Sequence, residues 1–241
     1  MDDALQQKLW RALAGGFGLK TNVMGPVTTW LSKTDTDFTL DGYWSDIAAF
    51  FGDAKNTSVE DLQHDTGLVE ATQRLSQLVL VTRWLNLSEQ DMTLLTGAPE
   101  QLDSSLSVAP RPDLSLLLLL TRFKRWQSQV TTSVDEALRL LPLLADIKSP
   151  VADVAEKIAA MHNLTVDSVI SMNTLLFGDG RFPDSFAQLY TLLTWLRTGQ
   201  VLNVGTAALH DLLTMAQSNP EAEDKNLITR VADALTAGLT R

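Results

Sequence analysis

The sequence predicts an all-α protein: an irregular array of short helical hairpins, with about a dozen helices. Leucines recur at three- and four-residue steps in many stretches, which places them on one face of a helix. Capping residues preceded by an apolar residue mark several helix starts. Nowhere do β-branched and aromatic residues alternate with polar ones over five positions, so no strand is expected. With 45% hydrophobic residues in 241, the chain can bury a core.

The stretch from Gln188 to Met215 shows this pattern best. We expect Asp184 to cap its first helix and Gly199 to end it. The apolar positions of the two predicted helices are Leu189, Leu192, Leu193 and Leu196, then Leu209, Leu212 and Leu213. Because two short amphipathic helices cannot bury both apolar faces alone, they need neighbours of the same kind.

The N-terminal part follows the same periodicity. Helices are predicted at residues 2–14, 23–31, 43–51 and 68–85. The first is expected to end at its glycines, Gly15, Gly16 and Gly18, and a polar loop over 32–41 precedes the third.

A corner between helices is predicted at Leu87–Met92. Ser88 can cap the following helix, with Asp91 as the third residue of a capping box. Leu87 and Met92 occupy the two positions of a hydrophobic staple, and the cap contributes about 1 kcal/mol. Leu164–Thr165 repeats this pattern.

Residues 98–113 form the main break in the helical pattern, because they are rich in proline and serine. We expect them to join an N-terminal helical subdomain, 1–97, to a C-terminal one, 114–241. In the latter, Asp113, Ser133 and Ser149 are expected to cap helices. Helices are predicted at 114–127, 134–141, 151–161, 166–177 and 227–239.

A loose internal repeat is visible. A leucine-rich helix ends near an aromatic residue or His, an apolar residue and a cap form a corner, and a shorter helix follows. Trp84–Leu95, His162–Leu176 and Trp195–Leu213 follow this pattern best, and Phe17–Leu31 follows it poorly. The irregular spacing excludes a fixed-period solenoid.

Charge and composition limit the partners. The net charge of −10 argues against binding nucleic acid or anionic lipid by basic surfaces. The absence of cysteine excludes disulfides, thiolate metal sites and a cysteine nucleophile. The acidic start, MDDALQQ, is no Sec signal peptide. The longest apolar run, 114–120, is far shorter than the roughly 20 residues that span a bilayer.

No residue pattern indicates chemistry, so we expect no catalytic, cofactor-binding or metal-binding residues, no cofactor and no enzyme activity. His64, His162 and His210 lack metal-ligand spacing, and a structural role is the simplest interpretation. A role for a histidine in pH sensing stays open. Two groups of aspartates invite a calcium interpretation, but turns and caps explain them as well. They are Asp35, Asp37 and Asp41, then Asp179 and Asp184.

The tryptophans are expected to pack in the core, because each of those considered lies on a predicted helix beside leucines. They are Trp10, Trp30, Trp84, Trp126 and Trp195.

Three segments resemble the A subunits of bacterial insecticidal Tc toxin complexes, and they occur in the family's order and spacing. LLLLLTRFKRWQSQV (116–130) is similar to a helix that opens with LLTR in that family. LYTLLTWLRTGQVLNVGTAALHDLLTM (189–215) resembles a helix, an LNV turn and a leucine helix. VADALTAGLTR (231–241) resembles the LTAGL that follows.

The resemblance implies a place in the α-helical shell of the A subunit, which forms a pentameric, pore-forming device that delivers a toxic enzyme into host cells. It implies that this chain is a fragment or one polypeptide of a split subunit. The implied partners are the rest of the A subunit and its pentamer, other toxin subunits and, through the full-length protein, a host receptor. The implied location is secreted or on the bacterial surface, and this fragment itself would not insert into a membrane.

The other hypothesis is a free-standing helical adaptor that binds a partner peptide or helix in a groove between hairpins. A shell fragment should expose an apolar face where other protein packs, and an adaptor should be a finished monomer with polar outer faces.

Overall fold

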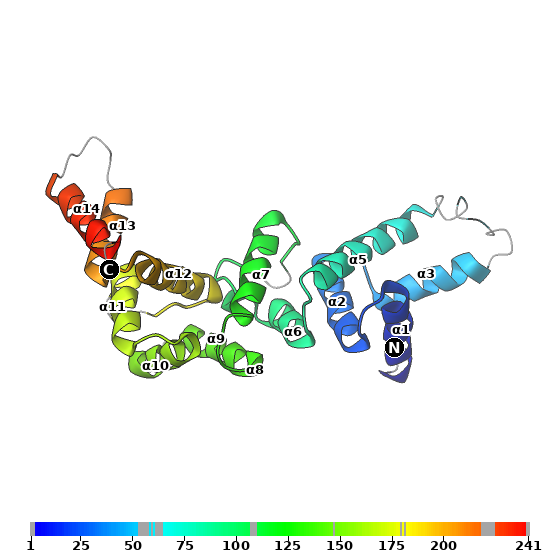
Figure 1. Ribbon diagram of the computed structural model, residues 1–241. Coiled ribbons are helices and arrows are strands. Elements are labelled where there is room, and N and C mark those ends of the chain that lie inside the picture. The colour runs from blue at the N-terminus through cyan, green and yellow to red at the C-terminus, as the bar shows by residue number, and fades with distance from the viewer. Residues whose placement is uncertain are drawn as a thin grey trace. The chain divides into compact units, whose positions relative to one another are not determined.

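The computed structural model describes residues 3–52, 58, 60, 65–106, 110–146, 148–178, 180, 182–217 and 225–239. Within these ranges the backbone forms helices, turns and irregular segments and no strand, which confirms the all-α fold class. The α-helices, labelled in Figure 1, are α1 (Asp3–Phe17), α2 (Thr21–Thr34), α3 (Leu40–Gly52), α5 (Thr66–Trp84), α6 (Glu89–Gly97), α7 (Leu114–Gln127), α8 (Val134–Leu138), α9 (Leu140–Ala145), α10 (Val151–His162), α11 (Val166–Phe177), α12 (Phe186–Leu202), α13 (Thr206–Gln217) and α14 (Lys225–Leu239). A short 3-10 helix, η1 (Pro99–Gln101), follows α6.

The chain divides into two compact units, Met1–Lys124 and Arg125–Arg241. The division falls inside α7. The assignment of 1–97 and 114–241 as subdomains joined by 98–113 stays a prediction.

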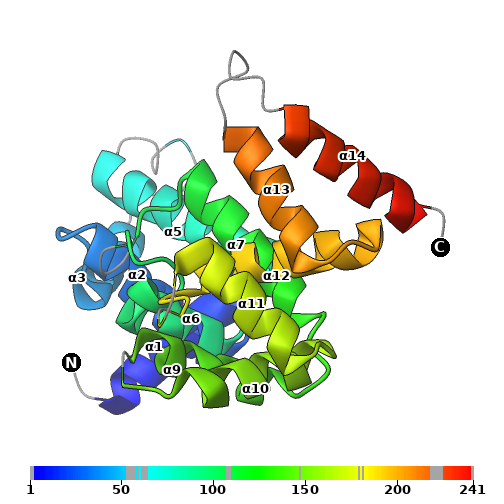
Figure 2. The same cartoon turned by 90° about the vertical axis from the view of Figure 1, so that its left-hand side faces the viewer.

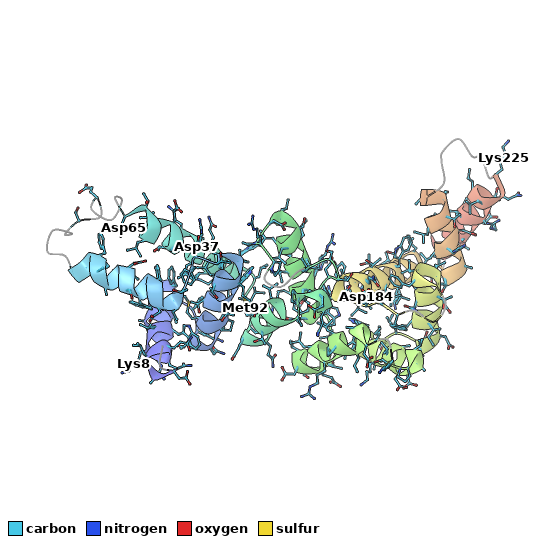
Figure 3. All side chains as sticks on the ribbon, turned by 180° about the vertical axis from the view of Figure 1, so that it is seen from behind. Lys8, Asp37, Asp65, Met92, Asp184 and Lys225 are labelled. Carbon is cyan, nitrogen blue, oxygen red and sulfur yellow. The ribbon has the colours of Figure 1, made fainter. Side chains whose placement is uncertain are left out.

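In the first unit, α2 is the central helix, because it contacts α1, α5 and α6. Its buried residues include Met24, Val27 and Trp30, each fully buried. The helix approaches α1 closely at Gly25, where a Cβ atom would lie 3.2 Å from the Trp10 ring. Figure 3 shows Met92 of α6, also fully buried, among these helices.

In the second unit, α11 takes the central place, because it contacts α10, α12 and α13. The last helix, α14, lies beside α13 and also contacts α12 (Figures 1 and 2). Gly238 permits this approach, since a Cβ atom there would lie 2.2 Å from the backbone oxygen of Leu202.

Four helix corners in the described residues share one backbone motif. Each has a left-handed residue after the first helix: Gly18 (φ 65°), Asn86 (φ 49°), Asn163 (φ 53°) and Asn203 (φ 52°). Glycine and asparagine tolerate this conformation best. The next residue is apolar, and its N–H donates to a carbonyl five positions earlier, as in a Schellman motif. These bonds are Leu19 to Ala14, Leu87 to Thr82, Leu164 to Ala159 and Val204 to Gly199, each 2.9 Å.

The predicted repeat is therefore more regular in structure than in sequence. In every one of the four corners the second helix begins three residues after the left-handed residue. The corner within Phe17–Leu31, which follows the sequence pattern poorly, has the same hydrogen bond as the others. Its glycine replaces the asparagine of the other three, which is why the sequence hides it.

The two units follow one plan. Each has two such hairpins, and the second helix of the first hairpin contacts both helices of the second hairpin. Several pairs of residues at equal distance from the corner are buried in both units. Examples are Met24 and Val169, Val27 and Met172, Thr28 and Asn173, Leu75 and Leu192, and Met92 and Leu209.

Two predicted helix ends were wrong. Gly199 does not end α12, which continues to Leu202 and stops at the left-handed Asn203. Leu209 approaches Gly199 instead, so that a Cβ atom there would lie 2.7 Å from Leu209 Cδ1. Gly15 and Gly16 lie inside α1, and Gly18 takes the left-handed position after it. Gly199 therefore allows a close contact between helices, and Gly18 follows the end of a helix.

Most predicted caps are confirmed. Ser88 accepts from the Asp91 N–H, and the Asp91 side chain accepts from the Ser88 N–H, which completes the capping box. The side chains of Asp113, Ser133 and Thr165 also accept from N–H groups of the first turns of α7, α8 and α11.

Two predicted caps were wrong. The residue before α12 is Ser185, which makes no capping bond, and the Asp184 N–H donates to Gln188 Oε1 instead. The residue before α10 is Pro150, not Ser149, and it has no side chain that can cap.

Core packing is confirmed for only some tryptophans. Trp30 and Trp126 are buried, and Trp10 and Trp195 are half-buried. Trp84 is 69% exposed, so its core assignment was wrong. Helical spacing beside leucines could not reveal which face of α5 meets a neighbour.

Candidate protein–protein interface

Large apolar side chains are exposed on the outer face of α5. Leu80 and Trp84 are four residues apart, so they lie on one face, and they are 62% and 69% exposed. Trp84 stands two residues before the left-handed Asn86. An exposed tryptophan beside an exposed leucine is typical of a surface that binds other protein.

The equivalent position in the second unit is also apolar and exposed. Val201 stands two residues before the left-handed Asn203 and is 83% exposed. A third exposed pair, Leu114 and Leu118, lies on one face of α7. The described surface therefore carries exposed apolar side chains on α5, α7 and α12.

A buried ion pair fixes α7 beside α6. Lys124 Nζ lies 2.8 Å from Asp91 Oδ2, and the Asp91 side chain is 1% exposed. Asp91 also accepts from the Ser88 N–H in the capping box. The carboxylate is thus held by a lysine and a backbone donor, an arrangement that compensates its burial and leaves it a structural role.

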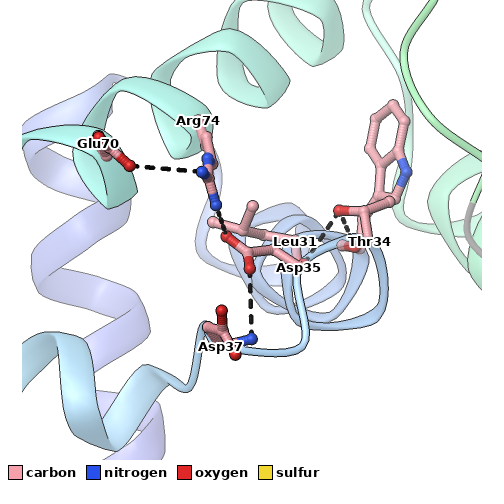
Figure 4. Close-up of polar contacts among 7 residues, drawn as sticks. Leu31, Thr34, Asp35, Asp37, Glu70 and Arg74 are labelled. Atoms are coloured by element: carbon pink, nitrogen blue, oxygen red, sulfur yellow. Dashed lines mark hydrogen bonds and ion pairs between the residues drawn. The ribbon is translucent and has the colours of Figure 1, made fainter. Parts of the chain in front are cut away.

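Among the aspartates after α2, Asp35 forms an ion pair. Asp35 accepts from Arg74 of α5, which Figure 4 shows between Asp35 and Glu70. The hydrogen bond and the charge of Asp35 raise the pKa of Arg74. The Asp37 N–H donates to Asp35 at 3.3 Å, and Asp41 lies in the first turn of α3.

No group of three or more His, Asp or Glu side chains in the described ranges is placed to hold a metal ion. Asp184 is exposed beside the start of α12. Asp179 and His64 lie outside the described residues. His210 is exposed on α13.

His162 is the histidine with a defined environment. The indole N–H of Trp126 donates to His162 Nε2 at 3.1 Å, which requires that nitrogen to be unprotonated. Trp126 also packs against Phe186, with ring centroids 5.4 Å apart. Burial, and secondarily the positive charge of Arg197, lower the pKa of His162 to about 4. The ring is therefore neutral at pH 7.

His162 ends α10, and it accepts from an indole on α7. Its partner is 36 residues away in sequence. No local pattern could have indicated the pair.

A cleft of about 540 Å³ lies in the second unit between the start of α10, the end of α11 and the start of α12. Its walls mix apolar and polar surface, and the apolar side chains include Leu144, Val154, Leu176 and Phe182. The polar side chains that line it are Asp146, Ser149, Asp184 and Gln188.

Among the described helices, none has the length and apolarity that crossing a membrane requires.

Neither the protein-family models nor the curated proteins contain a match to this chain. A solved structure does match: the cryo-EM structure of Yersinia pseudotuberculosis TcaA-TcaB, with a TM-score of 0.54 and 26% sequence identity. The match covers 98% of this chain and 14% of that chain. The chain thus spans only a small part of the protein that it resembles. This similarity relates both of its units to a component of a Tc toxin.

Proposed function

We propose that the chain is a non-enzymatic part of the α-helical shell of a Tc toxin A subunit. The observation that carries this proposal is the similarity to TcaA-TcaB over 98% of the chain. Because the similarity includes both units, it does not depend on one common helical hairpin. The three segments at 116–130, 189–215 and 231–241 support the A subunit in particular.

The exposed apolar side chains also support a shell role. Leu80, Trp84 and Val201 would each be covered by other protein in a large assembly, which would remove their apolar surface from water. Several polar side chains in the described ranges act as helix caps or form ion pairs, as is expected of a scaffold. Asp91 with Lys124 and Asp35 with Arg74 are examples.

In this proposal the partners are the rest of the A subunit, its copies in a pentamer and the other toxin subunits. Contact with a host receptor would come through the full-length protein. The assembly would act outside the bacterium, secreted or at its surface, as a translocation device, and this chain would transform no substrate.

The test is to purify the chain and mix it with the toxin polypeptides encoded beside it. We expect the chain alone to bind a dye that fluoresces on apolar surface, and to elute with the toxin polypeptides in size-exclusion chromatography. Dye binding should fall when the complex forms, because partner contacts cover the apolar sites. The proposal would be contradicted if the chain stays monomeric, binds no dye and elutes with none of the toxin polypeptides.

The second candidate is a free-standing adaptor, and the cleft of about 540 Å³ is the observation that favours it. A groove of leucine and phenylalanine side chains between helices can receive a partner helix. The same chromatography separates the two proposals, since an adaptor would stay monomeric after it is mixed with the toxin polypeptides.

A further inference from the structure

Several equivalent positions differ in burial between the two units, and four of them lie near the ends of the second helices of the hairpins. In the first unit, Trp30 and Leu31 of α2 are 0% and 2% exposed, and Leu95 and Thr96 of α6 are 0% and 6% exposed. Counting from the left-handed residues, their equivalents in the second unit are Leu175 and Leu176 of α11 and Leu212 and Leu213 of α13. All four equivalents are half-buried. We name these four leucines the α11–α13 face.

The first unit shows what covers this place. The described parts of the segment that follows α6, residues 98–106 and 110–124, contact α6 and α2. Its Leu102 is fully buried, and its Pro110 carbonyl accepts from the Trp30 indole N–H at 2.9 Å. At its end, Lys124 pairs with Asp91 of α6. The cover is thus a loop followed by a leucine-faced helix, α7, whose buried residues include Leu116, Leu120 and Phe123.

In the second unit, the helix that follows the hairpins lies elsewhere. Gly238 of α14 fits against the corner after α12, where its carbonyl accepts from Asn203 Nδ2 at 3.4 Å. Arg230 of α14 forms two hydrogen bonds with Asp211 of α13, at 2.9 and 3.0 Å. These contacts place α14 along α13 and α12, and the α11–α13 face stays half-exposed.

We propose that the α11–α13 face binds a loop-and-helix segment of another polypeptide, in the way that residues 98–106 and 110–124 contact α2 and α6 of the first unit. This rests on the proposed function, since it names the partner of a shell surface. A second copy of this chain is a poor occupant, because its own residues 98–106 and 110–124 already contact its first unit.

The residues of the face specify the chemistry of the partner. The position of Asp91 is occupied by Ala208, which has no carboxylate to pair with a lysine of the partner. The position of Trp30 is occupied by Leu175, which has no N–H group to donate to a carbonyl of the partner. The partner helix should therefore present leucine or phenylalanine at three- and four-residue steps, without the lysine that anchors α7.

The experiment places the photo-crosslinking residue benzoylphenylalanine at position 213 of the whole chain, assembled with the other toxin polypeptides. Illumination should link it to a leucine-faced helix of a different polypeptide, identified by mass spectrometry. A matched probe at position 156, on exposed α10, should give no such product. A product with a second copy of this chain, or no product from an assembled complex, would overturn the inference.

A pair of double variants separates this inference from the proposed function. Leu175→Ser with Leu213→Ser should weaken assembly at least tenfold, while a melting curve checks that the free chain still folds. The comparison variant is Leu80→Ser with Trp84→Ser. If only the comparison variant weakens assembly, the inference is wrong and the shell role stands. If the unaltered chain joins no toxin polypeptide, the proposed function itself fails. If the first variant does not fold, the crosslink decides.

Discussion

The first and second units use the same helical plan but complete it differently. In the first, residues 98–106 and 110–124 contact α2 and α6, and Trp30 and Leu95 are fully buried. In the second, the equivalents Leu175 and Leu212 stay half-exposed, and α14 packs against another side of the hairpins. A repeated fold therefore need not repeat its surface. The segment that follows each pair of hairpins decides which side is covered.

The largest expected effect compares two leucines at equivalent positions. Leu95→Ala should lower the free energy of unfolding by about 2–5 kcal/mol, because it leaves a cavity in a closed core. Leu212→Ala should lower it by less, about 2 kcal/mol, because that side chain keeps some contact with water and its removal leaves a less enclosed cavity. Chemical denaturation measures both. Equal losses would show that the two faces are covered alike.

The docking of α14 is particular to the second unit, and Gly238 tests it. Gly238→Ala should cost about 1–3 kcal/mol, because the added Cβ meets a backbone oxygen that cannot move alone. Amide hydrogen exchange should show α14 opening more often. Gly15→Ala is the control, since nothing lies within 4 Å of its Cβ position and a helical glycine gains about 0.5–1 kcal/mol as alanine. A harmless Gly238→Ala would argue against the close α14 contact.

At the first corner of each unit, the residue before the left-handed position is Phe17 in the first unit and His162 in the second. Only the corner in the second unit should therefore make the stability depend on pH. The folded pKa of about 4 lies below the ordinary 6.5, so the unfolded chain binds more protons between these values. The contribution of neutral His162 to the free energy of unfolding is fully present above pH 6.5 and is lost as pH falls toward 4. After allowance for solvent screening, we expect a loss of about 1–2 kcal/mol.

His162→Phe, which copies the first unit, should remove this part of the pH dependence. Denaturation midpoints at pH 7 and pH 5 would be compared with those of the unaltered chain. Because the variant also lacks the acceptor for Trp126, the difference between the two pH values is the readout, not the absolute stability. An unchanged difference would assign the pH response to other groups.

The smallest effect compares the caps of two equivalent corners. Ser88→Ala should cost about 1 kcal/mol, because Ser88 belongs to a complete capping box. Thr165→Ala should cost about 0.5 kcal/mol, because Ser168 bonds the Thr165 carbonyl and does not complete a capping box. Thermal melting resolves the order. A larger loss at Thr165 would show that the box adds nothing.

Local patterns predicted what depends on local interactions. The helices, the Ser88 box and the apolar face of α12 follow from side chains within one or two turns of one another. The same patterns failed at Gly199, which looked like a helix end. Its role comes from Leu209, a residue of the next helix. Exposure of Trp84 was missed for the same reason, since spacing gives a face but not its neighbour.

The sequence by itself determined an all-α chain with capped corners, because capping and leucine periodicity act over a few residues. Only the tertiary structure decided that Trp126 pairs with His162, that Lys124 anchors α7 to Asp91, and that the second unit leaves its α11–α13 face half-exposed. These features join residues far apart in the chain, and their partners are set by how whole helices pack.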